Sequence, residues 1–169
     1  MTEARFAATT VLIASLAILG AALGFQYLGG LEPCALCHWQ RYPYVATIVI
    51  GALAFGMSTV RPEPRRAIAA LVALAGALFL AGMGVSAFHV GVEQGWWEGL
   101  ATCGAPRGPA RDIEELRRML LGQKVVRCDE IAWSLFGISM AGYNFLLSLA
   151  LAGFAFIAAW NLLAAPPPR

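Results

Sequence analysis

The chain has 169 residues, of which 59% are hydrophobic and 13% are charged, whereas a soluble domain has about 25% charged residues. This composition excludes an ordinary soluble enzyme and a disordered chain, and a formal net charge of +2 argues against nucleic acid as a partner. We therefore expect one domain, 1–169, embedded in the lipid bilayer.

Four stretches without a charged side chain follow one another, each close to the 20 or so helical residues that cross a hydrocarbon layer. They predict membrane spans at about 7–27, 42–60, 67–92 and 138–163. The predicted fold is all-α: a polytopic bundle of four transmembrane helices, with loops at about 28–41 and 93–130 on one side of the membrane.

Small residues recur at every fourth position in two of these spans, a spacing typical of helix contacts in membranes. They are Gly20 and Gly24 in the first span and Ala69, Ala73, Ala77 and Ala81 in the third. We expect them at helix interfaces, although the abundance of Ala and Gly alone would also produce such a pattern.

Basic residues indicate the orientation only weakly. The short turn between the second and third spans contains Arg61, Arg65 and Arg66, while the long loop mixes its basic residues with acidic ones. The total number of Lys and Arg residues on each side favours the opposite orientation, but basic residues in short loops carry more weight than those in long loops. We therefore place this turn and both termini in the cytoplasm.

The four cysteines all fall in the two loops of the opposite face. Cys34 and Cys37 form a Cys-Ala-Leu-Cys motif, a spacing that favours a reducible disulfide and a reactive thiolate. A disulfide between Cys103 and Cys128 would close a long loop, and we expect it to be exposed and able to exchange with a soluble partner. The sequence itself permits three pairings of the four cysteines.

The second span follows the motif directly, so we expect Cys37 in the first turn of its helix, where the helix dipole stabilises a thiolate. Arg41 lies four residues further on the same face and can stabilise that thiolate or hold a polar, reducible head group. Snorkelling to the lipid interface is the alternative for Arg41. His89 ends the third span at a similar depth, where it is either a functional group or a simple interfacial residue.

Zinc is a rival explanation of the cysteines, with His38 as a further ligand. Structural zinc sites usually have two close cysteine pairs, and only Cys34 and Cys37 are close here, so we predict no metal. Within the long loop, Ile113, Leu116 and Leu120 share one face of a short helix predicted over 111–121. That helix would lie either on the bilayer surface or in solvent.

Several motifs occur in a specific order: Pro33-Cys34-Ala35-Leu36-Cys37 with Gln40-Arg41, His89-Val90-Gly91-Val92-Glu93, the loop pair Cys103 and Cys128, and Trp133 followed by Gly137-Ile138-Ser139-Met140-Ala141-Gly142-Tyr143-Asn144. Over nearly its whole length the chain thereby resembles the bacterial disulfide bond formation protein B (DsbB) family, quinone-linked thiol oxidases of the inner membrane. Tyr143 stands where the family pattern has Trp.

The resemblance implies a sequence of thiol–disulfide exchanges. A reduced DsbA-like thioredoxin-fold protein would attack Cys103 of a Cys103–Cys128 disulfide, and Cys128 would then exchange with Cys34. Cys37 would be left as a thiolate facing the quinone. Re-formation of Cys34–Cys37 would deliver two electrons to ubiquinone or menaquinone.

The resemblance also implies a quinone site that includes Arg41 and, as a second candidate, His89. It places both cysteine loops in the periplasm, because this chemistry needs an oxidising compartment. Two alternatives remain open from the sequence: a vitamin K epoxide reductase-like quinone oxidoreductase, and a non-enzymatic membrane scaffold or metal protein with structural cysteines.

Overall fold

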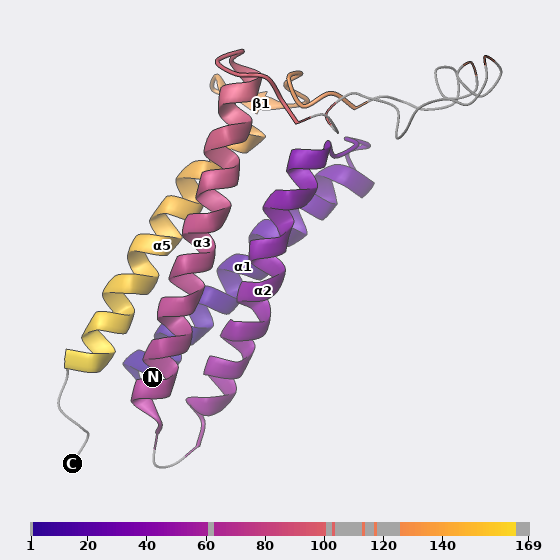
Figure 1. The fold of residues 1–169 in the computed structure, drawn as a ribbon. Helices are drawn as coiled ribbons and strands as arrows, with labels where there is room; N and C mark the ends of the chain where they lie inside the picture. Colours follow the sequence, from indigo (N-terminus) through magenta and orange to yellow (C-terminus); the bar gives the residue numbers. More distant parts are fainter. Residues whose placement is uncertain are drawn as a thin grey trace.

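The computed structural model describes residues 2–60, 63–100, 103, 113, 117 and 126–164. Its long helices are α1 (Glu3–Tyr27), α2 (Ala35–Met57), α3 (Arg65–Glu93) and α5 (Met140–Ala164). They run up and down in one bundle, so that α1 begins and α5 ends at the same end (Figure 1). The helix predicted over 111–121 lies outside the described residues, apart from Ile113 and Arg117.

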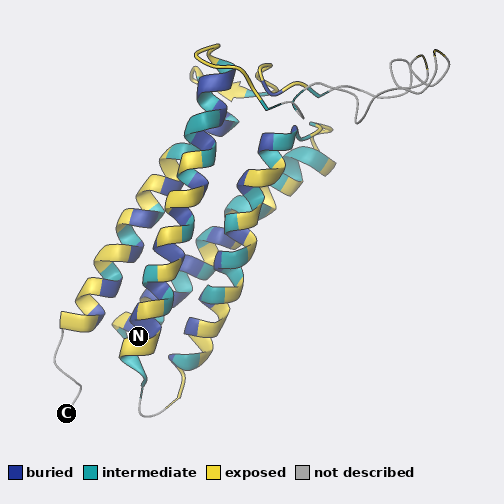
Figure 2. Cartoon of the chain, in the orientation of Figure 1, coloured by how far each residue is buried: buried dark blue, intermediate teal, exposed yellow. Residues whose placement is uncertain are grey.

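The bundle has the character of a multi-pass membrane protein. The helices α1, α3 and α5 are each long and apolar enough to cross a membrane. Exposed residues line the outer faces of the helices (Figure 2), and many are large and apolar, including Ile13, Leu53, Leu74 and Ile157. Lipid, rather than water, is the solvent that suits such faces. The all-α membrane bundle is therefore confirmed.

The second helix is longer at its start than the charge-free stretch at 42–60. Helix α2 begins at Ala35 and ends at Met57, so Cys37 lies in its first turn, as predicted. The first turns contain polar side chains, among them Gln40, which is 7% exposed. A search for charge-free residues misses these turns because it stops at Arg41, whose guanidinium donates to Gln26 of α1.

The small-residue stripes do not mark the helix interfaces. Gly20 is exposed, and a Cβ atom built on Gly20 or Gly24 would meet nothing within 4 Å. In α3, Ala69 is buried but Ala77 and Ala81 are exposed. A repeat of four residues advances about 40° around a helix of 3.6 residues per turn, so this ladder rotates away from the core.

The buried face of α3 instead follows alternating steps of four and three residues. Its members are Ile68, Val72, Ala75, Phe79, Gly82, Ser86 and His89. A mean step of 3.5 residues keeps one face toward the neighbouring helices, as in coiled coils. Close helix approaches occur at other glycines: a Cβ on Gly51 would lie 3.0 Å from the Leu12 backbone.

A short hairpin precedes the last helix. Strands β1 (Ser134–Leu135) and β2 (Ile138–Ser139) pair antiparallel, with Ser134 opposite Ser139. The two loop residues, Phe136 and Gly137, have φ angles of 51° and 78°, as a two-residue hairpin turn requires. The hairpin brings Ser139, at the start of α5, to the end of α3, where its hydroxyl donates to the Glu93 carboxylate.

Candidate active site

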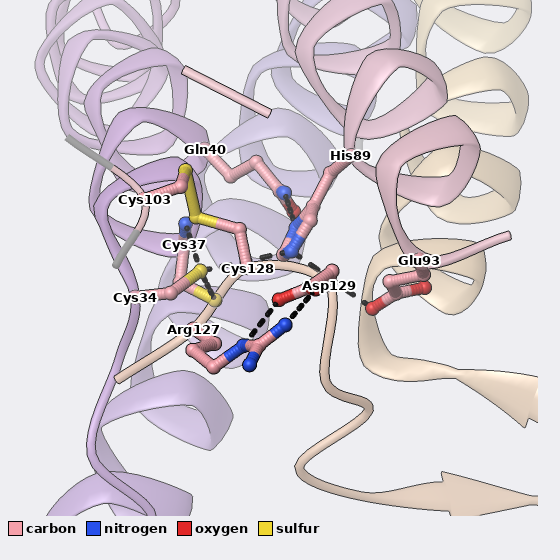
Figure 3. Close-up of a disulfide and its surroundings, with 9 residues drawn as sticks. All are labelled: Cys34, Cys37, Gln40, His89, Glu93, Cys103, Arg127, Cys128 and Asp129. Carbon is pink, nitrogen blue, oxygen red and sulfur yellow. Dashed lines mark hydrogen bonds and ion pairs between the residues drawn. A yellow bond between two sulfur atoms is a disulfide. The ribbon is translucent and has the colours of Figure 1, made fainter. Parts of the chain in front are cut away.

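All four cysteines meet at one end of the bundle, where the two loops join the helices (Figure 3). Cys34 and Cys128 are buried together with Leu36 and Val92, and Cys37 and Cys103 pack against this cluster. We call the four cysteines with these apolar neighbours the cysteine cluster. Residues more than 90 positions apart in the sequence are thus within one small volume, and the structure brings together every cysteine that the sequence singled out.

Cys103 and Cys128 form a disulfide with a Cα–Cα distance of 5.3 Å. Its two sulfur atoms differ in accessibility. Cys128 is fully buried, whereas Cys103 is half-buried and lines a hollow of about 650 Å³ with Trp96 and Trp97. The expectation of an exposed disulfide is therefore wrong for Cys128, because the loop folds it into the cysteine cluster, and an external thiol has better access to Cys103.

Cys34 and Cys37 are free thiols whose sulfur atoms lie 2.8 Å apart. A small approach would bring them to the disulfide distance of about 2.05 Å. Cys34 is the N-cap residue of α2, and its sulfur accepts the backbone N–H of Cys37 at 3.2 Å. The pair is therefore arranged to open and close a disulfide at the start of a helix.

The free N–H of this helix terminus points at Cys34 rather than Cys37. Hydrogen bonding from Cys37, followed by that from His89, outweighs the effect of burial and lowers the pKa of the Cys34 thiol from 9.0 to about 4. From the sequence, we expected the helix dipole to act on Cys37. In the reduced pair the helix terminus stabilises Cys34 instead, because the side chain of the N-cap residue accepts the free backbone N–H.

His89 is buried, with 4% of its surface exposed, so a simple interfacial placement does not describe it. Its Nε2 atom lies 3.6 Å from the sulfur of Cys34 and 3.9 Å from Oε1 of Glu93. Its Nδ1 atom lies 2.8 Å from Nε2 of Gln40. The imidazole thus connects the reactive pair to polar groups deeper in the bundle.

Arg41 is half-buried and donates from Nη1 to Oε1 of Gln26 at 2.6 Å. Its positive charge lies within electrostatic reach of Cys37. Gln26 was not predicted from the sequence, although an amide in a membrane span is itself a signal, since polar groups there are costly. Glu93 and Asn144 were likewise given no role, even though both lie within the quoted motifs.

The sulfur atoms of Cys34 and Cys37 and a ring nitrogen of His89 lie within 4.8 Å of one another, which is close enough to share a metal ion. His38, the ligand considered from the sequence, is exposed on the first turn of α2. A metal-bound histidine usually donates its second N–H to an acceptor, whereas Nδ1 of His89 faces the N–H₂ group of Gln40. This arrangement suits a free imidazole better than a metal ligand.

Comparison with known proteins identifies the family. The family model described as "Disulfide bond formation protein DsbB" matches residues 4–158. The disulfide bond formation protein B of Methylococcus capsulatus is 32% identical over 151 residues, covering 86% of this chain and 87% of that protein. The protein of the same name from Aromatoleum aromaticum is 32% identical, with coverage of 82% and 81%. No solved structure gave a significant match. With its cysteine pairs arranged as described, the chain belongs to the DsbB family of disulfide bond formation proteins.

Proposed function

We propose that the protein is a protein-disulfide:quinone oxidoreductase of the bacterial inner membrane. It reoxidises a DsbA-like thioredoxin-fold protein of the periplasm and passes the electrons to ubiquinone or menaquinone. The observation that carries this proposal is the packing of the Cys103–Cys128 disulfide against the Cys34–Cys37 pair within one cluster. Family membership supports the same activity.

The exchange begins at the accessible end of the disulfide. A partner thiolate attacks Cys103, the Cys103–Cys128 bond breaks, and the electron pair leaves on Cys128. Cys128 then attacks Cys34 of an oxidised Cys34–Cys37 pair, and Cys37 becomes the leaving thiolate. Burial of Cys34 and Cys128 in the same apolar cluster supports this step, since it keeps competing thiols away from both sulfur atoms.

The partner is released when its second thiolate attacks the mixed disulfide at its own sulfur, which frees Cys103. Cys103 attacks Cys128, the Cys103–Cys128 disulfide forms again, and Cys34 leaves as a thiolate. One dithiol of the partner has then become a disulfide, and Cys34 and Cys37 hold the two electrons.

A quinone, when bound, supplies an acceptor for two electrons and two protons, which allows Cys34 and Cys37 to close their disulfide. The donor groups of this chain fit its carbonyl oxygens. Arg41 carries five N–H donors and donates from one of them to Gln26, and its charge is within electrostatic reach of the half-buried Cys37. Arg41 is therefore our candidate for orienting the head group, and His89 is a second candidate.

The proposed orientation places the cysteine cluster in the periplasm and both termini in the cytoplasm. Disulfide exchange with a secreted partner requires an oxidising compartment. The short turn with Arg65 and Arg66 at the other end of the bundle agrees with this orientation under the positive-inside rule.

The test combines the purified full chain in detergent with a reduced thioredoxin-fold partner and a water-soluble ubiquinone analogue. We expect one quinone to be reduced for each partner dithiol oxidised, followed by quinone absorbance and thiol titration. Cys103→Ser and Cys37→Ser should each abolish turnover. Absence of quinone reduction, or turnover that survives Cys37→Ser, would contradict the proposal. Stoichiometric zinc in a preparation inert toward quinone would favour the metal-protein alternative.

A further inference from the structure

Buried polar side chains from three helices form one hydrogen-bonded network that ends at the cysteine cluster. Its members are Gln40 and Tyr44 of α2, Ser86 and His89 of α3, and Asn144 and Ser148 of α5. Polar groups inside a membrane bundle need internal partners, but that need alone does not fix which atoms donate. In this network the neighbours of each amide fix which atoms donate and which accept, and this assignment determines the protonated nitrogen of His89.

The direction of the network is set at Asn144. The hydroxyl of Tyr44 donates to Oδ1 of Asn144 at 2.5 Å, which identifies this atom as the amide oxygen. On its other side, Nδ2 of Asn144 lies 2.7 Å from Oγ of Ser86. The Ser86 hydroxyl already donates to the Gly82 carbonyl at 2.8 Å, so it accepts from Asn144. Both neighbours therefore give the Asn144 amide the same orientation.

Asn144 in turn orients Gln40. Its Nδ2 atom donates to Oε1 of Gln40 at 2.7 Å, so the N–H₂ group of Gln40 faces the other way, toward Nδ1 of His89 at 2.8 Å. A ring nitrogen that accepts a hydrogen bond carries no proton. The proton of the neutral imidazole is therefore on Nε2, the nitrogen that faces Cys34 and Glu93.

We propose that Gln40 and Asn144 are positioning residues that hold His89 as a neutral Nε2–H donor to the sulfur of Cys34. The proposal rests on the function proposed above and assigns a task within it. When Cys103 attacks Cys128, the Cys103–Cys128 bond forms, the Cys34–Cys128 bond breaks, and the electron pair leaves on Cys34. A hydrogen bond from His89 stabilises that charge, and a better stabilised thiolate leaves faster.

Other charged and titratable groups surround His89 and Cys34 among the described residues. Figure 3 shows Cys37 of α2, Glu93 of α3, and Arg127 and Asp129 of the loop. Two further groups belong to α2: Tyr44, which bonds to Asn144, and Arg41, whose charge is within electrostatic reach of Cys37. Arg127 and Asp129 pair with each other at the surface, and the near side of α5 presents the neutral Asn144. An effect of Gln40 on Cys34 is consequently transmitted through His89.

The chain has two histidines, so the tautomer can be observed directly. We would label the reduced full-length protein with ¹⁵N-histidine, using His38→Gln to assign the signals. His89 should give the shifts of a neutral Nε2–H imidazole. In Gln40→Met, which keeps the length of the side chain but removes the donor, and in Asn144→Leu, the Nδ1–H form should appear. An Nδ1–H or imidazolium signal in the parent protein, or no change in Gln40→Met, would overturn the proposal.

A second measurement follows the Cys34 thiolate by its ultraviolet absorbance in a Cys103→Ser/Cys128→Ser background. Gln40→Met should raise the titration midpoint by about one pH unit or more. The matched control is Ser15→Ala, which removes a buried hydrogen bond between Ser15 and Thr47 of α2. Thr47 bonds to the backbone carbonyl of Tyr44, so the side-chain bonds that orient His89 are left in place. An equal shift in both variants would reduce Gln40 to a structural role. Neither measurement contains quinone or partner protein, so the inference and the proposed function can fail separately.

Discussion

The sulfur of Cys34 caps helix α2 by accepting the backbone N–H of Cys37, three residues further on, at 3.2 Å. The same sulfur lies 2.8 Å from the sulfur of Cys37 and 3.6 Å from Nε2 of His89. The reduced form of the pair is therefore a thiolate beside a thiol rather than two thiols. This has a measurable consequence for the reduction potential of the pair.

Reduction of the Cys34–Cys37 disulfide should take up two electrons and one proton across pH 5–8. The pKa of Cys34 is lowered to about 4, so its thiolate persists until the pH falls through that value. We expect the potential to rise by about 30 mV for each unit that the pH falls, and by about 59 mV per unit below pH 4. Equilibration of the Cys103→Ser/Cys128→Ser protein with redox buffers measures this slope.

The control for this slope is His89→Ala. Loss of its hydrogen bond should raise the pKa of Cys34, so the steeper slope should begin at a higher pH than in the parent protein. A slope of about 59 mV per pH unit throughout pH 5–8 would mean that both thiols are protonated, and would contradict the assigned thiolate.

The two sulfur atoms of the loop disulfide should differ in reactivity after reduction. Cys103 is half-buried beside an open hollow, while Cys128 is fully buried. We expect a bulky maleimide to label Cys103 at least about tenfold faster than Cys128, because reaction requires access to the thiolate. Single-cysteine variants, analysed by mass spectrometry, give the two rates. Equal rates in the folded protein, matching those in denaturant, would show that Cys128 is not protected.

Much of the bundle was predictable from the sequence because lipid imposes a simple rule. A helix that crosses a bilayer excludes charge over about 20 residues, and the gaps between charged side chains locate α1, α3 and α5 well. The same rule fails at Ala35, where α2 begins within a polar segment. It also cannot detect the Phe136–Gly137 turn, which depends on two positive φ angles rather than on hydropathy.

The cysteines of the site were predictable, but their environment was not. Spacing predicted Cys34 and Cys37 as a close pair and Cys103 and Cys128 as a wider one, and the structure has both pairs. The link from His89 through Gln40 to Asn144 joins residues up to 104 positions apart, and no local pattern indicates such a contact. The prediction that the stripe from Ala69 to Ala81 lies at a helix interface was wrong for a geometric reason, since residues four apart rotate progressively around a helix of 3.6 residues per turn.

Arg41→Lys should impair the use of quinone more than it impairs exchange with the partner. The guanidinium bonds to Gln26 at 2.6 Å and keeps further N–H donors for a carbonyl oxygen. A lysine ammonium cannot reproduce this planar arrangement. Loss of one charge-assisted hydrogen bond corresponds to about a tenfold rise in KM for quinone, measured at saturating reduced partner.

Arg66→Lys is the matched control, since Arg66 is exposed at the other end of the bundle and its replacement should leave KM unchanged. Gln26→Leu should raise KM in the same direction as Arg41→Lys, because it releases the guanidinium. An unchanged KM in Arg41→Lys would support the alternative in which Arg41 only snorkels to the lipid interface.

Gly91 should be intolerant of even one added methyl group. A Cβ atom there would lie 2.0 Å from Cζ2 of Trp97, whose ring stacks on Phe88 at 5.9 Å and donates to its carbonyl oxygen. Phe88 packs against the cysteine cluster. Gly91→Ala must displace Trp97, and overpacking of this kind costs about 1–3 kcal/mol. Thermal unfolding in detergent should show the loss, together with faster labelling of Cys128 as the cluster loosens.

Gly84→Ala provides the comparison on the same helix. A Cβ at Gly84 would meet nothing within 4 Å, so this substitution should be neutral or raise stability by up to about 1 kcal/mol through helix propensity. A double-mutant cycle with Trp97→Ala then identifies the cause. If the clash with Trp97 is responsible, Gly91→Ala should cost little once the ring has been removed. An equal cost in both backgrounds would instead place the effect in the backbone of α3.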